Sequence, residues 1–523
     1  MSLSLITLQY CLPSPNHRPF DHMLFKNLSK KIGIIQLEHS KLFYSLVCVI
    51  YFVISYNSKG FNNADEHFQI IEFAQYKLGN STASDLAWEF NSRIRPSLQP
   101  TLCFLVFKIL GMLGITDSYI LAFSLRLLTG IASLAAIRYF TRSYRGLVKE
   151  ENVNVFLVMS YFLWFLPYIN VRFSSETWSG IMFLFFLSLI IRGGYKTNWQ
   201  KSALLGLIFG LSVLFRFQSG ILVVGAVLWL IFIARIGRGK LLIVLAFSFF
   251  TLLLGVLLDW WFYGEFCLTL YSYFYENIIN GVASQYGVSP WYQIPLYIIK
   301  SPGPIGLIIF FSILFLIYKD PKNLIVWTVI PFLIIHSIIP HKELRFLFPL
   351  AGLSPLIMIL AYQSMGTTSM SHAMLRSLLV FAAAINVLGL WAIGTRSAGN
   401  AKIGAASYID RRNSDHPVHL LFVKGLNPYS DWPFPKNTFY SSRRISMQEI
   451  STIWKPELLK RKKGFTNLLL VSSNEITGPK TLMMLKGMKA VPVFDNFDSL
   501  TQMINKVYDP DLNEDLLKIY ELR

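Results

Sequence analysis

Apolar runs dominate this sequence and recur along most of its length. The first covers residues 42–57, after a polar and basic start at 1–41, and a polar stretch follows at 58–97. Further apolar runs occur at roughly 98–115, 119–138, 153–169, 177–192, 202–216, 219–235, 241–258, 304–318, 324–339, 346–362 and 377–394. Several contain only about 16 residues. Since a helix needs about 20 residues to cross a bilayer, we expect some tilted or broken membrane helices.

The composition indicates a chain that crosses a membrane many times. Of its 523 residues, 53% are hydrophobic and 15% are charged, with a mean hydropathy of +0.46. The net charge of +19 does not indicate nucleic-acid binding, because the basic residues are spread over short loops between apolar runs. We therefore expect an all-α polytopic membrane protein with about 11–13 transmembrane helices and no nucleic-acid partner.

The basic loops predict which side of the membrane each polar segment occupies. They are Arg138–Lys149, Arg192–Lys201, Arg235–Lys240 and Lys319–Lys322. If these loops and residues 1–41 are cytoplasmic, the polar segments 58–97, 172–176, 216–218, 259–303 and 340–345 share the opposite side. Two full crossings at 98–115 and 119–138 would contradict this arrangement. We favour the interpretation in which one of those two runs does not cross.

Residues 395–523 have short apolar runs and frequent charges. Buried strands are predicted at His419–Val423, Leu468–Val471 and Val491–Phe494, with helices at Met447–Lys462 and Pro479–Met488. We expect a small α/β domain on the non-cytoplasmic side, after a membrane domain at 42–394. The four cysteines are scattered and form neither a disulfide framework nor a zinc-binding spacing.

Two charged clusters interrupt the apolar pattern. His341-Lys342-Glu343-Leu344-Arg345-Phe346 lies between two apolar runs, with Pro340 before it and Pro349 after it. Charge is costly inside the hydrocarbon, and proline breaks helices, so this cluster is expected at an interface or a polar cavity. The second cluster is Asn63–Gln69, which contains Asp65 and Glu66. The alternative for each cluster is an ordinary charged loop, but both fall on the same predicted side.

Together, the Asp65-Glu66 pair after the first span and the late His-Lys-Glu-x-Arg-Phe string resemble the lipid-phosphate-mannose-dependent α-mannosyltransferases. The resemblance runs from about 42 to 350 and is greatest to the branch that adds the third mannose of GPI anchors. It implies a GT-C-like fold and a polyprenyl- or dolichyl-phosphate mannose donor. The Arg172–Thr177 and Tyr286–Tyr292 strings also resemble family motifs, although Ser289 replaces a histidine.

The family position of the catalytic base falls on Asp65, with Glu66 as an alternative base or as a ligand for acceptor hydroxyls. The lipid phosphate of such a donor leaves as an anion, so one carboxylate that accepts the acceptor's proton suffices. Glycoside hydrolysis, by contrast, normally uses two carboxylates. A competing interpretation is that Asp65 only caps the following helix.

Binding of the donor phosphate requires fixed positive charge, which His341, Lys342, Arg345 and Arg216 supply. Glu343 is expected to orient Lys342 or Arg345. Substrate-binding roles are predicted for Arg95, Glu176, Tyr286 and Trp291. The simpler alternatives are a snorkelling side chain for Arg216 and an aromatic belt for Trp291.

Nucleotide-sugar and metal motifs are missing from the sequence, so we expect no cofactor and no metal. The expected partners are the lipid-phosphate mannose donor, a membrane glycolipid acceptor and the bilayer. Alternative functions are transfer of another sugar, transport of a lipid or solute, or a structural membrane subunit. A transporter would more often show internal repeats. The sequon Asn80-Ser81-Thr82 slightly favours the endoplasmic reticulum over a bacterial plasma membrane.

Overall fold

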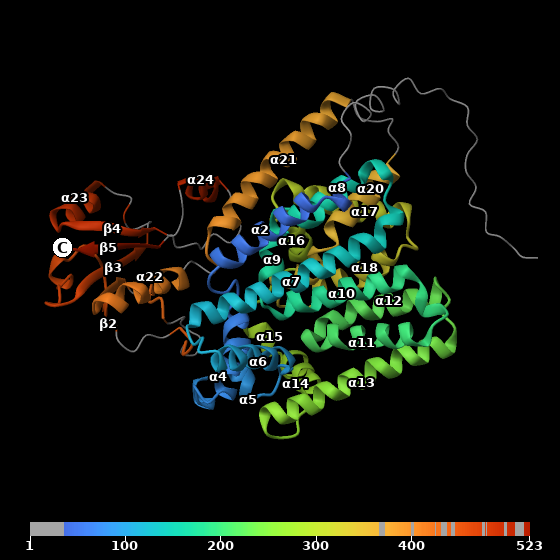
Figure 1. Cartoon of the computed structure of the whole chain (residues 1–523), viewed down its shortest axis with the longest axis horizontal. Helices are drawn as coiled ribbons and strands as arrows, with labels where there is room; N and C mark the ends of the chain where they lie inside the picture. Colours follow the sequence, from blue (N-terminus) through green and yellow to red (C-terminus); the bar gives the residue numbers. More distant parts are fainter. Residues whose placement is uncertain are drawn as a thin grey trace, which may run out of the picture.

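The protein consists of a large bundle of helices with a small sheet domain at one end (Figure 1). This computed structural model describes residues 36–365, 372–398, 402–423, 425–429, 437–440, 445–472, 476, 479–495, 499–507 and 517–523. The predicted N-terminal segment, 1–41, lies outside the described residues as far as residue 35. The predicted fold class, a helical membrane protein with a small C-terminal α/β domain, is confirmed.

The apolar runs of the sequence form the helices of the bundle. They are α2 (Lys41–Asn57), α6 (Leu98–Met112), α7 (Ser118–Tyr144), α8 (Val153–Phe162), α9 (Phe165–Val171), α10 (Ser175–Arg192), α11 (Trp199–Phe215), α12 (Gly220–Phe232), α13 (Arg238–Tyr263), α17 (Pro304–Lys319), α18 (Leu324–Ile338), α20 (Ser354–Ser364) and α21 (His372–Thr395). Most of α10 is buried, and it packs against α7 and α11. Its second residue, Glu176, therefore has a fixed position at one end of the bundle.

Three described helices are long and apolar enough to cross a membrane by themselves: Ser118–Leu147, Ser175–Arg192 and Arg238–Tyr263. Two more spans result if α8 with α9, bent by 51°, and Leu344–Ala351 with α20, bent by 65°, each count as one. Seven shorter apolar helices of 10–17 residues accompany them within the described ranges. Broken helices are thus present as expected, and the number of 11–13 crossings stays a prediction.

Glycines bring α11 and α13 close together. A Cβ added at Gly206 would lie 2.3 Å from the Val244 carbonyl oxygen, and one at Gly210 would lie 2.4 Å from Cβ of Thr251. Small residues at such a contact let two membrane helices approach along their backbones. This packing fixes α11, whose C-cap residue, Arg216, lies at the candidate site described below.

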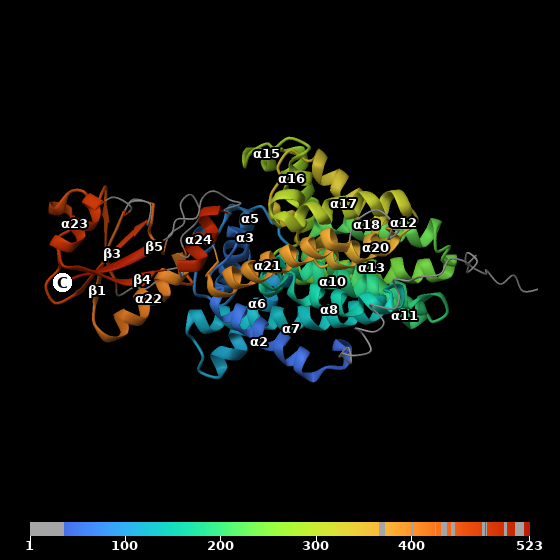
Figure 2. The same ribbon diagram turned by 90° about the horizontal axis from the view of Figure 1, so that it is seen from above.

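Short helices connect the bundle at the end that carries the charged clusters. In the loop after α2 they are α3 (Ala64–Glu66), the π-helical turn η2 (His67–Ile71), α4 (Glu72–Lys77) and α5 (Trp88–Asn91). Between α13 and α17 they are α14 (Thr269–Phe274), η8 (Tyr275–Ile279), α15 (Val282–Gln285) and α16 (Gln293–Lys300). After α18 come η9 (Leu344–Leu347) and α19 (Phe348–Ala351). Figure 2 shows α3 and α5 at the end of the bundle that faces the sheet domain.

The sheet domain follows α21 and begins with α22 (Lys402–Asp415). Its five strands are β1 (Val418–Val423), β2 (Ser446–Ile450), β3 (Thr466–Ser472), β4 (Ala490–Asp495) and β5 (Leu517–Leu522), in the order β2-β1-β3-β5-β4. β1 runs parallel to β2 and β3, whereas β5 runs antiparallel to β3 and β4. Helix α23 (Pro479–Gly487) packs against β4, whereas α24 (Ser499–Val507) contacts α21 of the bundle. β1 and β3 are buried almost throughout, which explains their continuous apolar sequences.

The predicted helix Met447–Lys462 is wrong. Residues 446–450 form β2, an edge strand whose residues alternate in burial, and only Pro456–Leu458 form a short 3-10 turn. Met, Gln and Glu favour helices, but pairing of β2 with β1 outweighs this weak preference. β5 was not predicted either, because Lys518 and Glu521 interrupt its apolar positions.

Candidate active site

Asp65 and Glu66 begin the first helix after α2, so their backbone is well defined. Asn63 is the N-cap residue of this helix, and its side chain accepts a hydrogen bond from the Asp65 backbone N–H at 3.1 Å. Asp65 is therefore not the capping residue. Carboxylates in a first helical turn are favoured by the helix dipole. Asp65 and Glu66 are consecutive in the helix and contact different groups.

Asp65 lies between two arginines from distant parts of the chain. Its Oδ2 accepts hydrogen bonds from Nη1 of Arg345 at 2.5 Å and from Nη2 of Arg95 at 3.3 Å. Burial raises the pKa of Asp65, but the charges of Arg345 and Arg95 more than offset it, so the net pKa is lowered. Asp65 is therefore ionised at neutral pH, and its carboxylate is free to accept a proton.

Glu66 is held in a less charged environment. Its carboxylate accepts a hydrogen bond from the Asn62 backbone N–H at 3.3 Å and lies 3.7 Å from Nη1 of Arg172. Burial raises the pKa of Glu66 to about 7, because the attraction of Arg172 only partly compensates and Glu176 adds repulsion. The two adjacent carboxyl groups therefore have opposite pKa shifts, a pattern typical of catalytic sites.

The His-Lys-Glu-x-Arg-Phe string forms a compact ionic group. Arg345 donates to Glu343 through Nε at 2.7 Å and through Nη2 at 2.8 Å, which leaves its Nη1 for Asp65. His341 Nε2 lies 2.9 Å from Oε1 of Glu343, and this hydrogen bond raises the pKa of His341. Asn63 also donates to Glu343, at 3.0 Å. The two charged clusters, 280 residues apart, thus meet as the sequence predicted.

Glu176 and Arg216 extend the ionic group formed by Asp65, Glu343 and Arg345. Oε1 of Glu176 lies 2.8 Å from Nη1 of Arg216 and 3.4 Å from Nη1 of Arg345. Ser175 accepts a hydrogen bond from Arg216 at 3.0 Å. Arg216 is almost fully buried in this contact, so the snorkelling interpretation does not describe it. One carboxylate therefore orients two of the predicted phosphate-binding arginines.

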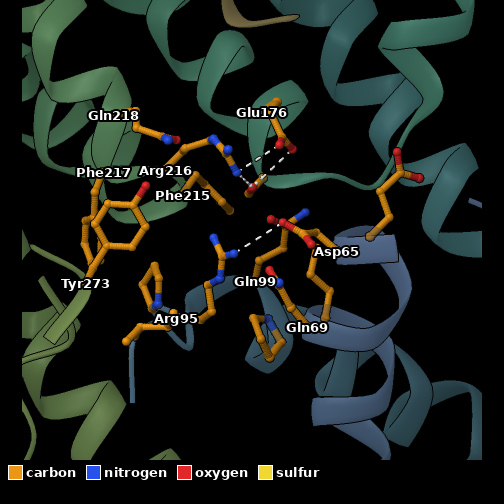
Figure 3. Close-up of a pocket in the computed structure, with 16 residues that line it drawn as sticks. Asp65, Gln69, Arg95, Gln99, Glu176, Phe215, Arg216, Phe217, Gln218 and Tyr273 are labelled. Carbon is orange, nitrogen blue, oxygen red and sulfur yellow. Dashed lines mark hydrogen bonds and ion pairs between the residues drawn. The ribbon is translucent and has the colours of Figure 1, made fainter. Parts of the chain in front are cut away.

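Asp65, Glu66, Glu176 and Arg216 border an open cavity that is lined largely by polar residues (Figure 3). In this view Arg95 and Gln99 lie below Glu176 and Arg216, with Asp65 to the right and Tyr273 to the left beside Phe217 (Figure 3). The complete lining is Asp65, Glu66, Gln69, Ile70, Ile94, Arg95, Pro96, Gln99, Pro100, Ser175, Glu176, Phe215, Arg216, Phe217, Gln218 and Tyr273. Phe215 and Phe217 add apolar surface, so the cavity combines hydrogen-bonding groups with ring faces, as sugar-binding sites require.

Gln99 is a site residue that the sequence analysis missed. It is 2% exposed, and neither its Nε2 nor its Oε1 has a hydrogen-bond partner. Nε of Arg95, in the same cavity, is also buried without a partner. Buried polar atoms are nearly always paired, so these atoms are available to bind water or a polar ligand. The sequence signal is a glutamine between Pro96 and Pro100 at the start of an apolar run.

Five of the predicted residues lie outside the cavity lining, namely His341, Lys342, Arg345, Tyr286 and Trp291. His341 and Arg345 contact it through Glu343 and Asp65. Nζ of Lys342 instead donates to backbone carbonyls of Ser289 at 2.9 Å and Ile339 at 2.6 Å. Glu343 therefore orients Arg345 and His341. The described contacts of Lys342 do not include Glu343. The role of Lys342 in binding the donor stays a prediction, and these contacts fit a structural role for it.

Tyr286 and Trp291 lie on the surface. The Tyr286 hydroxyl accepts a hydrogen bond from Nε1 of Trp88 at 2.5 Å, and its ring centroid is 6.2 Å from that of His341. Trp291 is 69% exposed and packs edge-on against Tyr292. Neither residue lines the cavity, and their substrate-binding roles stay predictions. Within the described ranges, no three His, Cys, Asp or Glu side chains gather as metal ligands.

The chain belongs to the Alg9-like mannosyltransferase family, whose profile matches residues 42–424. The resemblance inferred from the two charged clusters is thereby confirmed. The chain is 26% identical over 377 residues to GPI mannosyltransferase 3 of Debaryomyces hansenii, which is 66% of this chain and 63% of that protein. It is 26% identical over 297 residues to GPI alpha-1,2-mannosyltransferase 3 of Homo sapiens, which is 54% of this chain and 51% of that protein.

The matched region thus spans between about half and two thirds of the length of these two relatives. Among solved structures, ArnT from Cupriavidus metallidurans bound to undecaprenyl phosphate aligns with a TM-score of 0.49 at 12% identity. That alignment covers 92% of this chain and 97% of that chain. A likeness at this level carries no conclusion about the present protein.

Proposed function

We propose that the protein is a membrane α-mannosyltransferase that moves mannose from a polyprenyl- or dolichyl-phosphate donor to a GPI-type or other lipid-linked glycan. The observation that carries this proposal is the placement of Asp65. Its ionised carboxylate borders a polar cavity and shares a hydrogen bond with Arg345, which is a candidate ligand for the donor phosphate. Membership of the Alg9-like family and the names of the relatives support mannose as the sugar.

The transfer is proposed to be a single displacement with inversion at the anomeric carbon. The acceptor hydroxyl gives its proton to Asp65 while its oxygen forms the new bond to that carbon. The bond from the same carbon to the phosphate oxygen breaks, and its electron pair leaves with the lipid phosphate, which becomes a phosphate monoester. Arg345, Arg216 and His341 stabilise the phosphate as its negative charge grows. No general acid is needed, because the leaving group is already a stable anion.

A second candidate for the base is Glu66. Its pKa of about 7 matches the value expected for an efficient base at neutral pH, whereas that of Asp65 is lowered by two arginines. The resting contacts of Asp65 change, however, once Arg345 turns to a bound phosphate. Asp65 then loses part of its positive surroundings and becomes more basic. We therefore assign the base to Asp65 and the acceptor's hydroxyls to Glu66, Gln99 and Glu176.

The cellular setting follows from the proposed donor. Nucleotide sugars are made in the cytoplasm, so a site on the opposite side requires a sugar that arrives on a lipid. We propose that the cavity faces the lumen of the endoplasmic reticulum, with the bilayer supplying both donor and acceptor. The sequon at Asn80 and the GPI-related names of the relatives support this compartment.

The test uses the purified full-length protein with dolichyl-phosphate mannose and a GPI-type acceptor. Asp65→Asn keeps the size of the side chain and removes its basicity, so turnover should fall by a factor on the order of 10² or more. Glu66→Gln should lower turnover less than Asp65→Asn. Asp85→Asn, on an exposed turn of the same loop, is the matched control. Unchanged turnover in Asp65→Asn contradicts the assignment, and a larger loss in Glu66→Gln transfers the role of base to Glu66.

A further inference from the structure

Glu72 is a buried carboxylate that the proposed reaction does not use. It lies on the same continuous helical stretch as Asp65, after the π-helical turn η2, and is 1% exposed. Its carboxylate accepts hydrogen bonds from His67 Nε2 at 2.9 Å, Thr438 N at 2.9 Å, Phe439 N at 3.1 Å and the Thr438 hydroxyl. Three of these four donors come from the C-terminal part of the chain, about 366 residues away.

The segment Asn437–Tyr440 is fixed to the membrane bundle at further points. The Phe439 ring stacks on Phe107 of α6, with centroids 5.3 Å apart and planes 2° from parallel. The carbonyl of Phe439 accepts a hydrogen bond from Ser118 Oγ, at the start of α7, at 2.6 Å. A second link joins Tyr119, through its hydroxyl, to Asp410 of α22. The C-terminal part of the chain therefore contacts α6, which directly follows the loop carrying Asp65, and the start of α7.

His67, two residues after Asp65, is part of the same contact. Its ring stacks between Phe61, at 5.0 Å and 23°, and Tyr440, at 5.5 Å and 18°. It is fully buried, and its Nε2 is bonded to Glu72. The Asn437–Tyr440 segment thus contacts the helical stretch that follows Asp65 at two points. One is the carboxylate of Glu72, and the other is the ring of His67, next to Glu66.

Three of the four donors to the buried Glu72 carboxylate are present only when the C-terminal part of the chain is docked against the bundle. Burial alone raises the pKa of Glu72, but its hydrogen bonds to His67, Thr438 and Phe439 lower the pKa on balance, so the carboxylate is charged. A buried charge that loses its hydrogen-bond donors is strongly destabilised. The helix therefore has a strong preference for the position in which Glu72 meets the segment.

We propose that Glu72 and Asn437–Tyr440 form a latch through which the C-terminal domain holds Asp65 in its reactive position. Glu72, Thr438 and Phe439 are positioning residues, since none of them lines the cavity. This inference rests on the proposed function, in which Asp65 is the base. A displacement of about 1 Å between reacting groups can lower a rate by a factor on the order of 10². Loosening the latch should therefore slow the chemical step more than it weakens donor binding.

The first test compares Thr438→Val and Glu72→Gln in the full-length protein. Each should lower kcat by at least about tenfold while KM for dolichyl-phosphate mannose changes by less than about twofold. Thr438→Ser keeps the hydroxyl and should restore most of the activity. The double variant should be little worse than the poorer single variant, because both changes remove one link. Glu449→Gln and Thr452→Val, in the same domain but away from the latch, are matched controls.

The second test measures the latch without any turnover. Amide hydrogen exchange over residues 64–72 should speed up by at least about tenfold in Thr438→Val, with the overall melting temperature retained. Glu72→Gln, measured in the same way, covers the case in which Thr438→Val fails to fold. Wild-type exchange and wild-type kcat in a folded Thr438→Val protein overturn the latch. If exchange speeds up but the wild-type protein transfers no mannose, the latch stands and the proposed function fails.

Discussion

Arg345 connects the proposed base to the proposed leaving group. Its guanidinium donates to Asp65 and Glu343 and lies within reach of Glu176. A donor phosphate that takes over Nη1 of Arg345 removes a positive neighbour from Asp65 and so raises the basicity of that carboxylate. Glu343 keeps the guanidinium in place through the other two nitrogens. We therefore expect donor binding and activation of the base to be coupled through this one side chain.

Replacement of Arg345 tests this coupling. Arg345→Ala should raise KM for the donor and also lower kcat by a factor on the order of 10², because the phosphate gains charge as it leaves. Arg345→Lys should recover little, since an ammonium cannot bridge Asp65 and Glu343 as the planar guanidinium does. Steady-state kinetics in parallel with Arg238→Ala, an exposed arginine at the first position of α13, provide the measurement. A change in KM with kcat preserved would show that Arg345 acts only in binding.

Gln99 should contribute to substrate binding through its unpaired amide. Gln99→Ala removes both hydrogen-bonding atoms, so KM for donor or acceptor should rise about tenfold, equivalent to roughly 1.4 kcal/mol. Gln99→Leu, of similar size, should act in the same way and remove the unpaired buried atoms, so the protein should not melt earlier. Kinetics and melting temperature are measured together. Unaltered KM values for both substrates in both variants would exclude Gln99 from the binding site.

The raised pKa of Glu66 should make the free energy of unfolding fall as pH rises. Its pKa is about 7 in the folded protein and near 4.5 when unfolded, so the folded state binds the extra proton between those values. Stability from this group is therefore complete below about pH 4.5 and is lost as pH rises through about 7. Glu66→Gln should flatten the decline of melting temperature between pH 5 and 8. An equal slope in wild type and variant would contradict the raised pKa.

At the scale of elements, the sequence predicted those parts whose signal is local. The apolar runs located the membrane helices, and the two charged clusters located Asp65 and Arg345. The charges of the loops predict that both clusters lie on the same side of the membrane. The individual contact between Asp65 and Arg345 is visible only in the fold. Met447–Lys462 was assigned to a helix because its residues favour one, while the strand β2 is formed by pairing with β1. Gln99 was missed because a single glutamine in an apolar run carries no motif.

The latch lies beyond what local pattern can predict. Glu72 and Thr438 are separated by 366 residues, and neither belongs to a recognisable string. The η2 turn between Asp65 and Glu72 likewise has no sequence signal here, although π-helical turns often occur at functional sites. Such contacts depend on how the C-terminal domain docks against α6 and α7. They become visible only when the three-dimensional arrangement is known.

At the scale of the whole molecule, the site and the sheet domain lie at the same end of the bundle (Figures 1 and 2). We therefore predict that Ser84, in the loop after α2, and Glu449, in β2, face the same side of the membrane. Gly237, in a basic loop, should face the other. Single cysteines at these positions, on a cysteine-free background, are labelled with an impermeant reagent in sealed vesicles. Labelling of positions 84 and 449 from opposite sides would exclude a shared compartment.

The measurement that tests the central proposal most directly is the choice of donor. Purified protein is supplied with dolichyl-phosphate mannose and a GPI-type acceptor in the presence of a chelator, and separately with a nucleotide-linked mannose. We predict transfer from the lipid donor with the chelator present and none from the nucleotide, because fixed arginines meet the single charge of the phosphodiester. Transfer from the nucleotide donor, or none from the lipid donor by a folded protein, would contradict the account.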